Sequence, residues 1–226
     1  MSNNTRTQRH ESPKKKTVKN KKKRSTGSII LKITLGLVFV GCLLFLSGVA
    51  LFWSYAKDAP KLEDAKLESP NSSKFFAANG DLFQEVGAEK RETIEATEIP
   101  RLLEDAIISV EDRRFYEHVG VDPIRIVGSV ISNVSTGGMQ GGSTLTQQLI
   151  KLSFFSTDAS DQTLERKAQE AWMAVQLEKE KSKQEILTYY INKVYMSNGL
   201  YGMRTASKAF YGLSLEELNL PQTALI

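Results

Sequence analysis

The sequence predicts a mainly α-helical protein with a single transmembrane helix and a small β-hairpin ahead of its helical part. Residues 33–53 carry no charge and are mostly apolar, and a helix of that length spans roughly 30 Å, the thickness of a bilayer's hydrocarbon layer. Beyond Pro100, apolar residues recur every three or four positions, which is the period of a helix. Between these regions, Asn79-Gly80 separates two apolar runs, a strong signal for a hairpin.

Residues 1–28 form a basic tail that we expect to be disordered, because it has almost nothing apolar to bury. Residues 1–32 contain eleven Lys and Arg side chains and a single acidic one, Glu11. Positive charge beside a transmembrane helix stays on the cytoplasmic side. We therefore predict a cytoplasmic tail in contact with anionic lipid, a single-pass anchor in the cell membrane at 29–53, and an extracytoplasmic remainder.

A cleaved signal peptide is the alternative interpretation of this region, since "SYA" at 54–56 resembles a small-x-small cleavage site. The apolar stretch is longer than the apolar region of a signal peptide, which usually has about 7 to 15 residues, and the segment before it is very long. Both features favour an uncleaved anchor. Cys42, the only cysteine, lies inside the apolar stretch, so no disulfide is expected outside the membrane.

The chain after the apolar stretch is acidic, although the whole chain has a net charge of +4. It holds nineteen of the thirty basic and twenty-five of the twenty-six acidic residues, a balance of −6. The basic character of the whole chain therefore does not indicate a nucleic-acid partner. A polar linker at 54–72 leads to a domain at 73–226, which is long enough to build its own core.

One carboxylate stands on a stripe of residues that a helix would bury. Leu103, Ile107, Glu111 and Phe115 follow one another at intervals of four, so they share a helix face. Desolvation favours the neutral form of a carboxyl group and makes the carboxylate a stronger base, which suits acid–base catalysis. An ion pair with Arg114, or a helix end that reaches solvent, is the alternative structural interpretation.

A glycine-rich stretch at 137–142 precedes a predicted helix capped by Ser143 or Thr144. Thr144 and Gln147 have the spacing of a capping box. Free amides and the positive end of the dipole at such a helix start attract anions, and Lys151, two turns on, could add a cation. The stretch does not match a nucleotide-binding P-loop. An ordinary capped helix after a flexible loop is the alternative.

Residues 164–196 predict two helices, and the first carries a second acid, Glu170, on an apolar face. Arg166 and Lys167 precede Glu170 by about one turn, so a surface ion pair is one explanation. The opposite face is apolar too, and we therefore expect this helix to be buried on all sides. The apolar residues near Glu170 are Met173, Ala174 and Leu177, and those of the opposite face are Leu164, Ala168, Ala171, Trp172 and Val175.

His118 lies near three acids in the sequence, Glu111, Asp112 and Glu117, which raises the question of a metal site. The spacings do not resemble a zinc motif, so we predict no metal ligands here. Apolar residues between 124 and 134 are expected mostly in the core, whereas Phe154 and Phe155 could touch lipid.

Five stretches of the chain carry motifs that become specific in combination. They are "EDRRFYEHVGVD", "GGSTLTQQLIK", "RKAQE", "KQEILTYYIN" and "GLYGMRTASKAFYG". In order and spacing they resemble the sequence blocks of the peptidoglycan glycosyltransferases, which occur as the N-terminal module of bifunctional class A penicillin-binding proteins and in monofunctional relatives. The resemblance covers about residues 73–226. Ser207 departs from it, because the family commonly has alanine there.

The resemblance implies a lysozyme-like helical fold beside the membrane and a glycosyl transfer. The 4-hydroxyl of the GlcNAc on lipid II would attack the anomeric carbon of a lipid-linked glycan strand, with inversion and loss of undecaprenyl pyrophosphate. By this similarity Glu111 is the general base and Glu170 assists at the donor side. The residues expected to neutralise the leaving group are Lys151, Arg166 and Lys167. Those expected to line the donor cleft are Ser143, Thr144, Gln147 and Gln148.

The residue chemistry agrees with transfer to a hydroxyl. A departing pyrophosphate needs positive charge more than a proton, whereas a glycosidase needs a second carboxylic acid for its leaving group. Cations near Glu170 therefore favour transfer, and a divalent cation such as Mg²⁺ could share their work. The partners implied are lipid II, the growing strand, the membrane, and proteins of wall synthesis and division.

Two other functions stay open at this point. A membrane-anchored muramidase or lytic transglycosylase could use a similar fold. A non-catalytic scaffold of the wall-building machinery could have the same fold without the activity. The chain stops at "LPQTALI" in what we expect to be a helix. The resemblance therefore implies an incomplete domain with a transpeptidase domain downstream.

Overall fold

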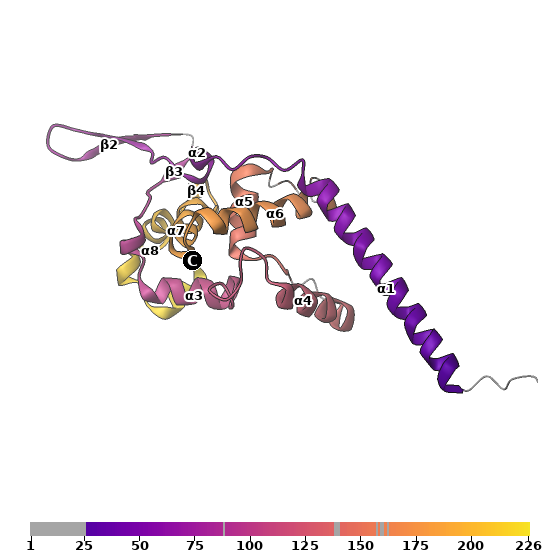
Figure 1. Cartoon of the computed structure of the whole chain (residues 1–226). Helices are drawn as coiled ribbons and strands as arrows, with labels where there is room; N and C mark the ends of the chain where they lie inside the picture. The colour runs from indigo at the N-terminus through magenta and orange to yellow at the C-terminus, as the bar shows by residue number, and fades with distance from the viewer. Residues whose placement is uncertain (1–25, 88, 138–140, 157, 159–160, 162) are drawn as a thin grey trace, which may run out of the picture. The chain divides into compact units, whose positions relative to one another are not determined.

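The computed structural model describes residues 26–87, 89–137, 141–156, 158, 161 and 163–226 (Figure 1). Most of the predicted basic tail, together with Gly138 of the glycine-rich stretch, lies outside these residues. The chain divides into two compact units, residues 1–48 and residues 49–226.

Helix α1 (Thr26–Ala56) contains the predicted apolar stretch. Its segment Ile30–Ala56 is long and apolar enough to cross a membrane, and it is the one such helix among the described residues. The helix runs past position 53, and its last turn belongs to the second unit. There Ala56 is buried, and the Trp53 ring stands edge-on to Trp172 with 5.2 Å between ring centroids. The single apolar N-terminal helix is thus confirmed, while the anchor limits of 29–53 stay a prediction.

The segment expected as a polar linker contains a short helix, α2 (Asp64–Leu67). Leu67 is buried in the core of the second unit, and Asp64 accepts a hydrogen bond from Lys181 at 3.0 Å. Part of the predicted linker is therefore packed against the domain.

Strands β1 (Ser73–Phe76) and β2 (Leu82–Val86) form the predicted antiparallel hairpin, which extends away from the helices (Figure 1). The Asn79-Gly80 pair lies in its loop, and Gly80 has φ +88°, a value that favours glycine. Two further short strands, β3 (Lys90–Arg91) and β4 (Leu200–Tyr201), pair in parallel.

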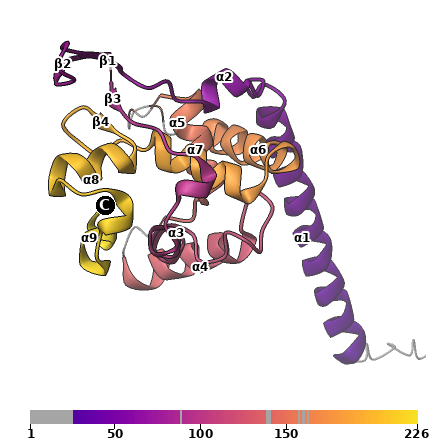
Figure 2. The ribbon, with the colours of Figure 1, turned by 90° about the vertical axis from the view of Figure 1, so that its left-hand side faces the viewer.

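The remaining described elements are helical, which confirms the mainly α prediction (Figure 2). Helix α5 packs against α6 and α7, so it is central; α3 packs against α9, and α7 against α8. The helices are α3 (Arg101–Glu111), α4 (Pro123–Thr136), α5 (Leu145–Phe154), α6 (Leu164–Glu180), α7 (Lys183–Lys193), α8 (Met203–Tyr211) and α9 (Leu220–Leu225), with 3₁₀ turns η1 (Ala96–Glu98) and η3 (Leu215–Glu217).

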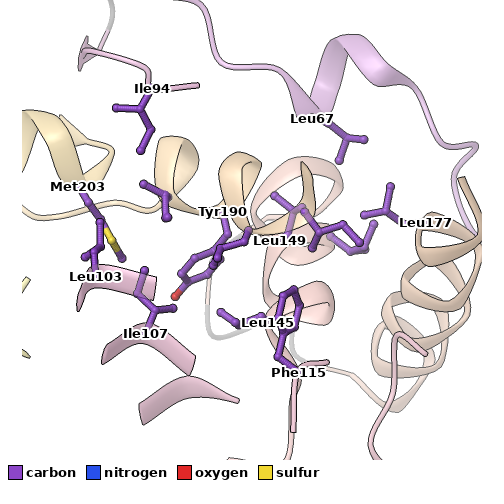
Figure 3. Close-up of a cluster of buried hydrophobic side chains, with 14 of the residues drawn as sticks. Leu67, Ile94, Leu103, Ile107, Phe115, Leu145, Leu149, Leu177, Tyr190 and Met203 are labelled. Atoms are coloured by element: carbon purple, nitrogen blue, oxygen red, sulfur yellow. The ribbon is translucent and has the colours of Figure 1, made fainter. Parts of the chain in front are cut away.

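The core forms around α5, whose Leu145 and Leu149 are fully buried among side chains from the surrounding helices (Figure 3). Phe115 is also fully buried, but not as the helix stripe predicted. Helix α3 ends at Glu111, and Phe115 enters the core from the turns that follow. The packed α5 supplies a rigid base for the polar side chains on its remaining face.

Two burial predictions are wrong. Helix α6 is not buried on all sides, because Leu164 at its first position is 80% exposed. The apolar residues of α4 were expected mostly in the core, yet they form an exposed face, with Val134 at 84%. Phe154 and Phe155 pack half-buried against the core, and their contact with lipid stays a prediction. Periodicity identifies an apolar face but not what covers it.

Candidate active site

A cavity of about 640 Å³ opens between the end of α3 and the N-terminal parts of α4, α5 and α6. Its lining residues are Val110, Glu111, Arg125, Gly141, Gly142, Ser143, Gln147, Gln148, Lys151 and Lys167. It therefore brings together six of the nine predicted site residues. Thr144, Arg166 and Glu170 are buried and do not line it.

Glu111, the last residue of α3, presents a half-buried carboxylate to this cavity. The side chain of Gln148 donates from Nε2 to Glu111 Oε2 at 2.8 Å, and Tyr190 Oη donates to Gln148 Oε1 at 3.3 Å. Burial, and then the negative charge of Glu111, raises the pKa of Tyr190, so the phenol stays a donor. The alternative ion pair between Glu111 and Arg114 does not form. Arg114 pairs with Glu117 instead, with 3.1 Å between Arg114 Nε and Glu117 Oε2.

The start of α5 has the predicted capping box: Thr144 Oγ1 accepts from the amide of Gln147, and Gln147 Oε1 accepts from the amide of Thr144. Thr144 Oγ1 also donates to the carbonyl of Gly120 at 2.6 Å. The amide of Leu145, the first of the helix, donates to Asp112 Oδ2 at 3.0 Å. The helix start predicted to attract an anion thus holds a carboxylate of the protein itself.

Asp112 is fully buried and joins α5 to the segment after α3. His118 Nε2 lies 2.9 Å from Asp112 Oδ2, and Arg125 Nη1 lies 3.7 Å from Oδ1. Burial alone would raise the pKa of Asp112, but the hydrogen bonds from His118 and Leu145 hold it below its ordinary value. Asp112 and His118 were considered from the sequence only as metal ligands, although both lie with Glu111 in the stretch "EDRRFYEHVGVD" that carries the family resemblance.

The lowered pKa of Asp112 predicts a pH-dependent contribution to stability. The carboxylate stabilises the fold fully above about pH 4, its ordinary range, and the contribution is lost as pH falls through the lowered native value. Asp112→Asn should cost about 1 to 3 kcal/mol near neutral pH. Urea unfolding from pH 3 to 7 should show this cost shrinking on the acid side. Glu117→Gln, at an exposed carboxylate, is the control, and a cost for Asp112→Asn that does not vary with pH contradicts the prediction.

Glu170 is fully buried and pairs with two cations, the buried Arg166 and the partly exposed Lys167. Its Oε1 is 3.0 Å from Arg166 Nε, and its Oε2 is 2.5 Å from Lys167 Nζ. Lys167 Nζ also donates to Ser143 Oγ at 3.2 Å, which places the ammonium at the cavity. Arg166 Nη1 donates to the carbonyl of Ser156 at 2.9 Å. Two cations against one carboxylate leave this cluster with one net positive charge.

Two acidic side chains near the cavity, Glu170 and Asp112, are already held by partners within the protein. Both oxygens of Glu170 are taken by cations, and Asp112 is held by His118 and Leu145. Within the described part of the chain, no group of three or more His, Cys, Asp and Glu side chains could hold a metal ion. The carboxylate oxygens of Glu170 and Asp112 are therefore already committed to partners within the protein, and a divalent cation such as Mg²⁺ at the site stays a prediction.

The chain belongs to the transglycosylase family, the peptidoglycan glycosyltransferases whose sequence blocks it carries, since the model of that family matches residues 79–226. Among curated proteins it is similar to penicillin-binding protein 1A of Streptococcus oralis, with 54% identity over 190 residues, or 84% of this chain and 30% of the relative. Penicillin-binding protein 1A of Streptococcus pneumoniae (strain ATCC BAA-255 / R6) is 53% identical over 179 residues, 79% of this chain and 25% of the relative.

A more distant relative extends the comparison. Penicillin-binding protein 1A/1B of Bacillus subtilis (strain 168) is 41% identical over 210 residues, covering 92% of this chain and 23% of the relative. The chain thus spans between about a quarter and a third of the length of these relatives. These findings confirm the resemblance to class A penicillin-binding proteins that the five sequence stretches indicated.

Proposed function

We propose that the chain polymerises lipid II into glycan strands by inverting glycosyl transfer, with release of undecaprenyl pyrophosphate. The observation that carries this proposal is the shared cavity, which is lined by one carboxylate, Glu111, and two ammonium groups, those of Lys151 and Lys167. Transfer from a diphosphate donor needs a base near the acceptor's hydroxyl and positive charge near the donor's diphosphate while both substrates are bound side by side.

Glu111 is the general base in this proposal. Its carboxylate takes the proton of the acceptor's 4-hydroxyl while that oxygen attacks the anomeric carbon of the donor. Attack from the face opposite the leaving group inverts the configuration at that carbon. Gln148, held between Tyr190 and Glu111, fixes the direction of the carboxylate but leaves its other oxygen without a bond to Gln148.

The cationic side of the cavity receives the leaving group. As the bond between the anomeric carbon and the phosphate oxygen breaks, its electron pair stays on the pyrophosphate, and the charge is neutralised by Lys151 and Lys167. Ser143, Gln147 and Gln148 line the same donor cleft. Glu170 does not line the cavity but holds Lys167 in place, and Arg166 in turn pairs with Glu170.

The surroundings of the cavity suit a substrate that stays in the bilayer. Helix α4, which supplies Arg125 to the cavity, exposes a nearly continuous apolar face with Ile124, Ile131 and Val134 each more than 60% exposed. Such a face is favoured in contact with lipid rather than water. We place this domain outside the cell membrane, with the basic tail in the cytoplasm, because of the charge asymmetry across the apolar helix.

The test supplies purified lipid II and, separately, finished cell-wall polymer to the membrane-reconstituted full chain. Longer glycan strands from lipid II, with no fragments from the polymer, are the expected result. Fragments from finished polymer without chain growth would show a muramidase or lytic transglycosylase instead. Binding of lipid II with neither product would favour a scaffold.

A further inference from the structure

We propose that Arg125, at the start of α4, is the positioning residue for the general base, an inference that rests on the proposed function. Arg125 lines the cavity, and its guanidinium joins three segments of the chain. Nη1 donates to the backbone carbonyl of Glu111 and lies 3.7 Å from Asp112 Oδ1, while Nε donates to the carbonyl of Gly141 at 3.4 Å. Neither helical periodicity nor a sequence motif indicated this residue.

The carboxylate of Glu111 projects from the last residue of a helix, where the free backbone carbonyls make a negative charge unfavourable. Glu111 ends α3, and the last carbonyls of a helix carry partial negative charge and lack partners within the helix. This charge disfavours the ionised side chain that general-base catalysis requires. The guanidinium of Arg125 satisfies that carbonyl and offsets its charge, and it also fixes the backbone from which the carboxylate projects.

The same guanidinium connects the base to the cationic side of the cavity. Its Nε bonds Gly141, and Ser143, two residues on, accepts a hydrogen bond from Lys167. A planar guanidinium holds two carbonyls through donors in fixed directions on separate nitrogens, whereas the rotatable ammonium of lysine does not fix this geometry. Arg125 therefore sets the separation between the carboxylate of Glu111 and the loop that carries Ser143.

Arg113 provides a matched control within the same helix end. Its Nε donates to the carbonyl of Ser109 at 3.0 Å, so it too places a guanidinium on the last turn of α3. Arg113 is exposed and does not line the cavity. Arg113→Gln and Arg125→Gln each remove one positive charge from the same helix end, but Arg125→Gln alone removes the contacts to Glu111 and Gly141.

The experiment measures lipid II polymerisation by the full chain in liposomes as a function of pH. Arg125→Gln should lower kcat by about ten- to a hundred-fold with little change in KM, because the base is displaced. It should also move the acidic limb of the pH–rate profile upward by about 0.5 to 1 pH unit, because the ionised carboxylate loses a compensating cation. Arg125→Lys should keep the limb near its wild-type position and still lower kcat. Arg113→Gln should change neither.

Three results would overturn the inference. Arg125→Gln could match Arg113→Gln in both kcat and pH profile. It could raise KM with kcat unchanged, which would make Arg125 a substrate-binding residue. It could lower kcat in proportion to the folded fraction seen in a thermal melt, with the limb unmoved, which would make its effect structural. A wild-type chain that does not extend lipid II, or an active Glu111→Gln variant, would instead contradict the proposed function.

Discussion

Replacing Glu111 with glutamine is expected to lower the rate of glycan polymerisation by about 10²- to 10⁴-fold, the usual contribution of a general base. Glutamine keeps the shape of the side chain, and its carbonyl oxygen can still accept the hydrogen bond from Gln148. It cannot accept the proton of the attacking hydroxyl. The substitution therefore separates basicity from packing, and lipid II extension measured on gels resolves a change of this size.

The control for this prediction is Glu117→Gln, which removes an exposed carboxylate six residues away. It should keep polymerisation within about two-fold of the wild type, since exposed positions away from a site seldom matter by more than about 0.5 kcal/mol. Both variants should melt close to the wild type. If Glu111→Gln polymerises lipid II as fast as Glu117→Gln does, the carboxylate at position 111 is not the base.

The features of the site that could be predicted from the sequence depend on short spacings. The capping box of Thr144 and Gln147 follows from a separation of three residues, and the ion pairs of Glu170 with Arg166 and Lys167 follow from separations of four and three. The apolar helix and the hairpin depend on patterns of the same local kind. These features need only the geometry of one helix or one turn.

The contacts that complete the site join residues distant in sequence, so no local pattern indicates them. Leu145 binds the carboxylate of Asp112 across 33 positions, and Arg125 binds the carbonyl of Glu111 across 14. The prediction of which helix faces are buried was only partly right, for a related reason. The stripe through Leu103 and Ile107 is buried as predicted, but the similar face of α4 is exposed, because the sequence does not state which helices become neighbours.

The largest effect on stability is expected at Glu170, whose replacement with alanine should cost about 3 to 5 kcal/mol. Glu170 is fully buried, and Arg166, 6% exposed, is held beside it in the interior. Without the carboxylate the guanidinium is left buried and uncompensated, whereas Lys167, with a 43% exposed side chain, can turn to solvent. Removing one partner of a buried pair is costly for this reason, even where forming the pair gains little.

Glu165→Ala is the matched control, since it removes an exposed carboxylate from the first turn of the same helix and should cost about 0.5 kcal/mol or less. Glu170→Gln should lie between the two alanine variants, because its amide oxygen can still accept from Arg166 without balancing the charge. Urea unfolding of the three variants measures the differences directly. Equal stabilities for Glu170→Ala and Glu165→Ala would show that solvent reaches Arg166 when the carboxylate is absent, and Glu170 would then be retained for its hold on Lys167 rather than for the fold.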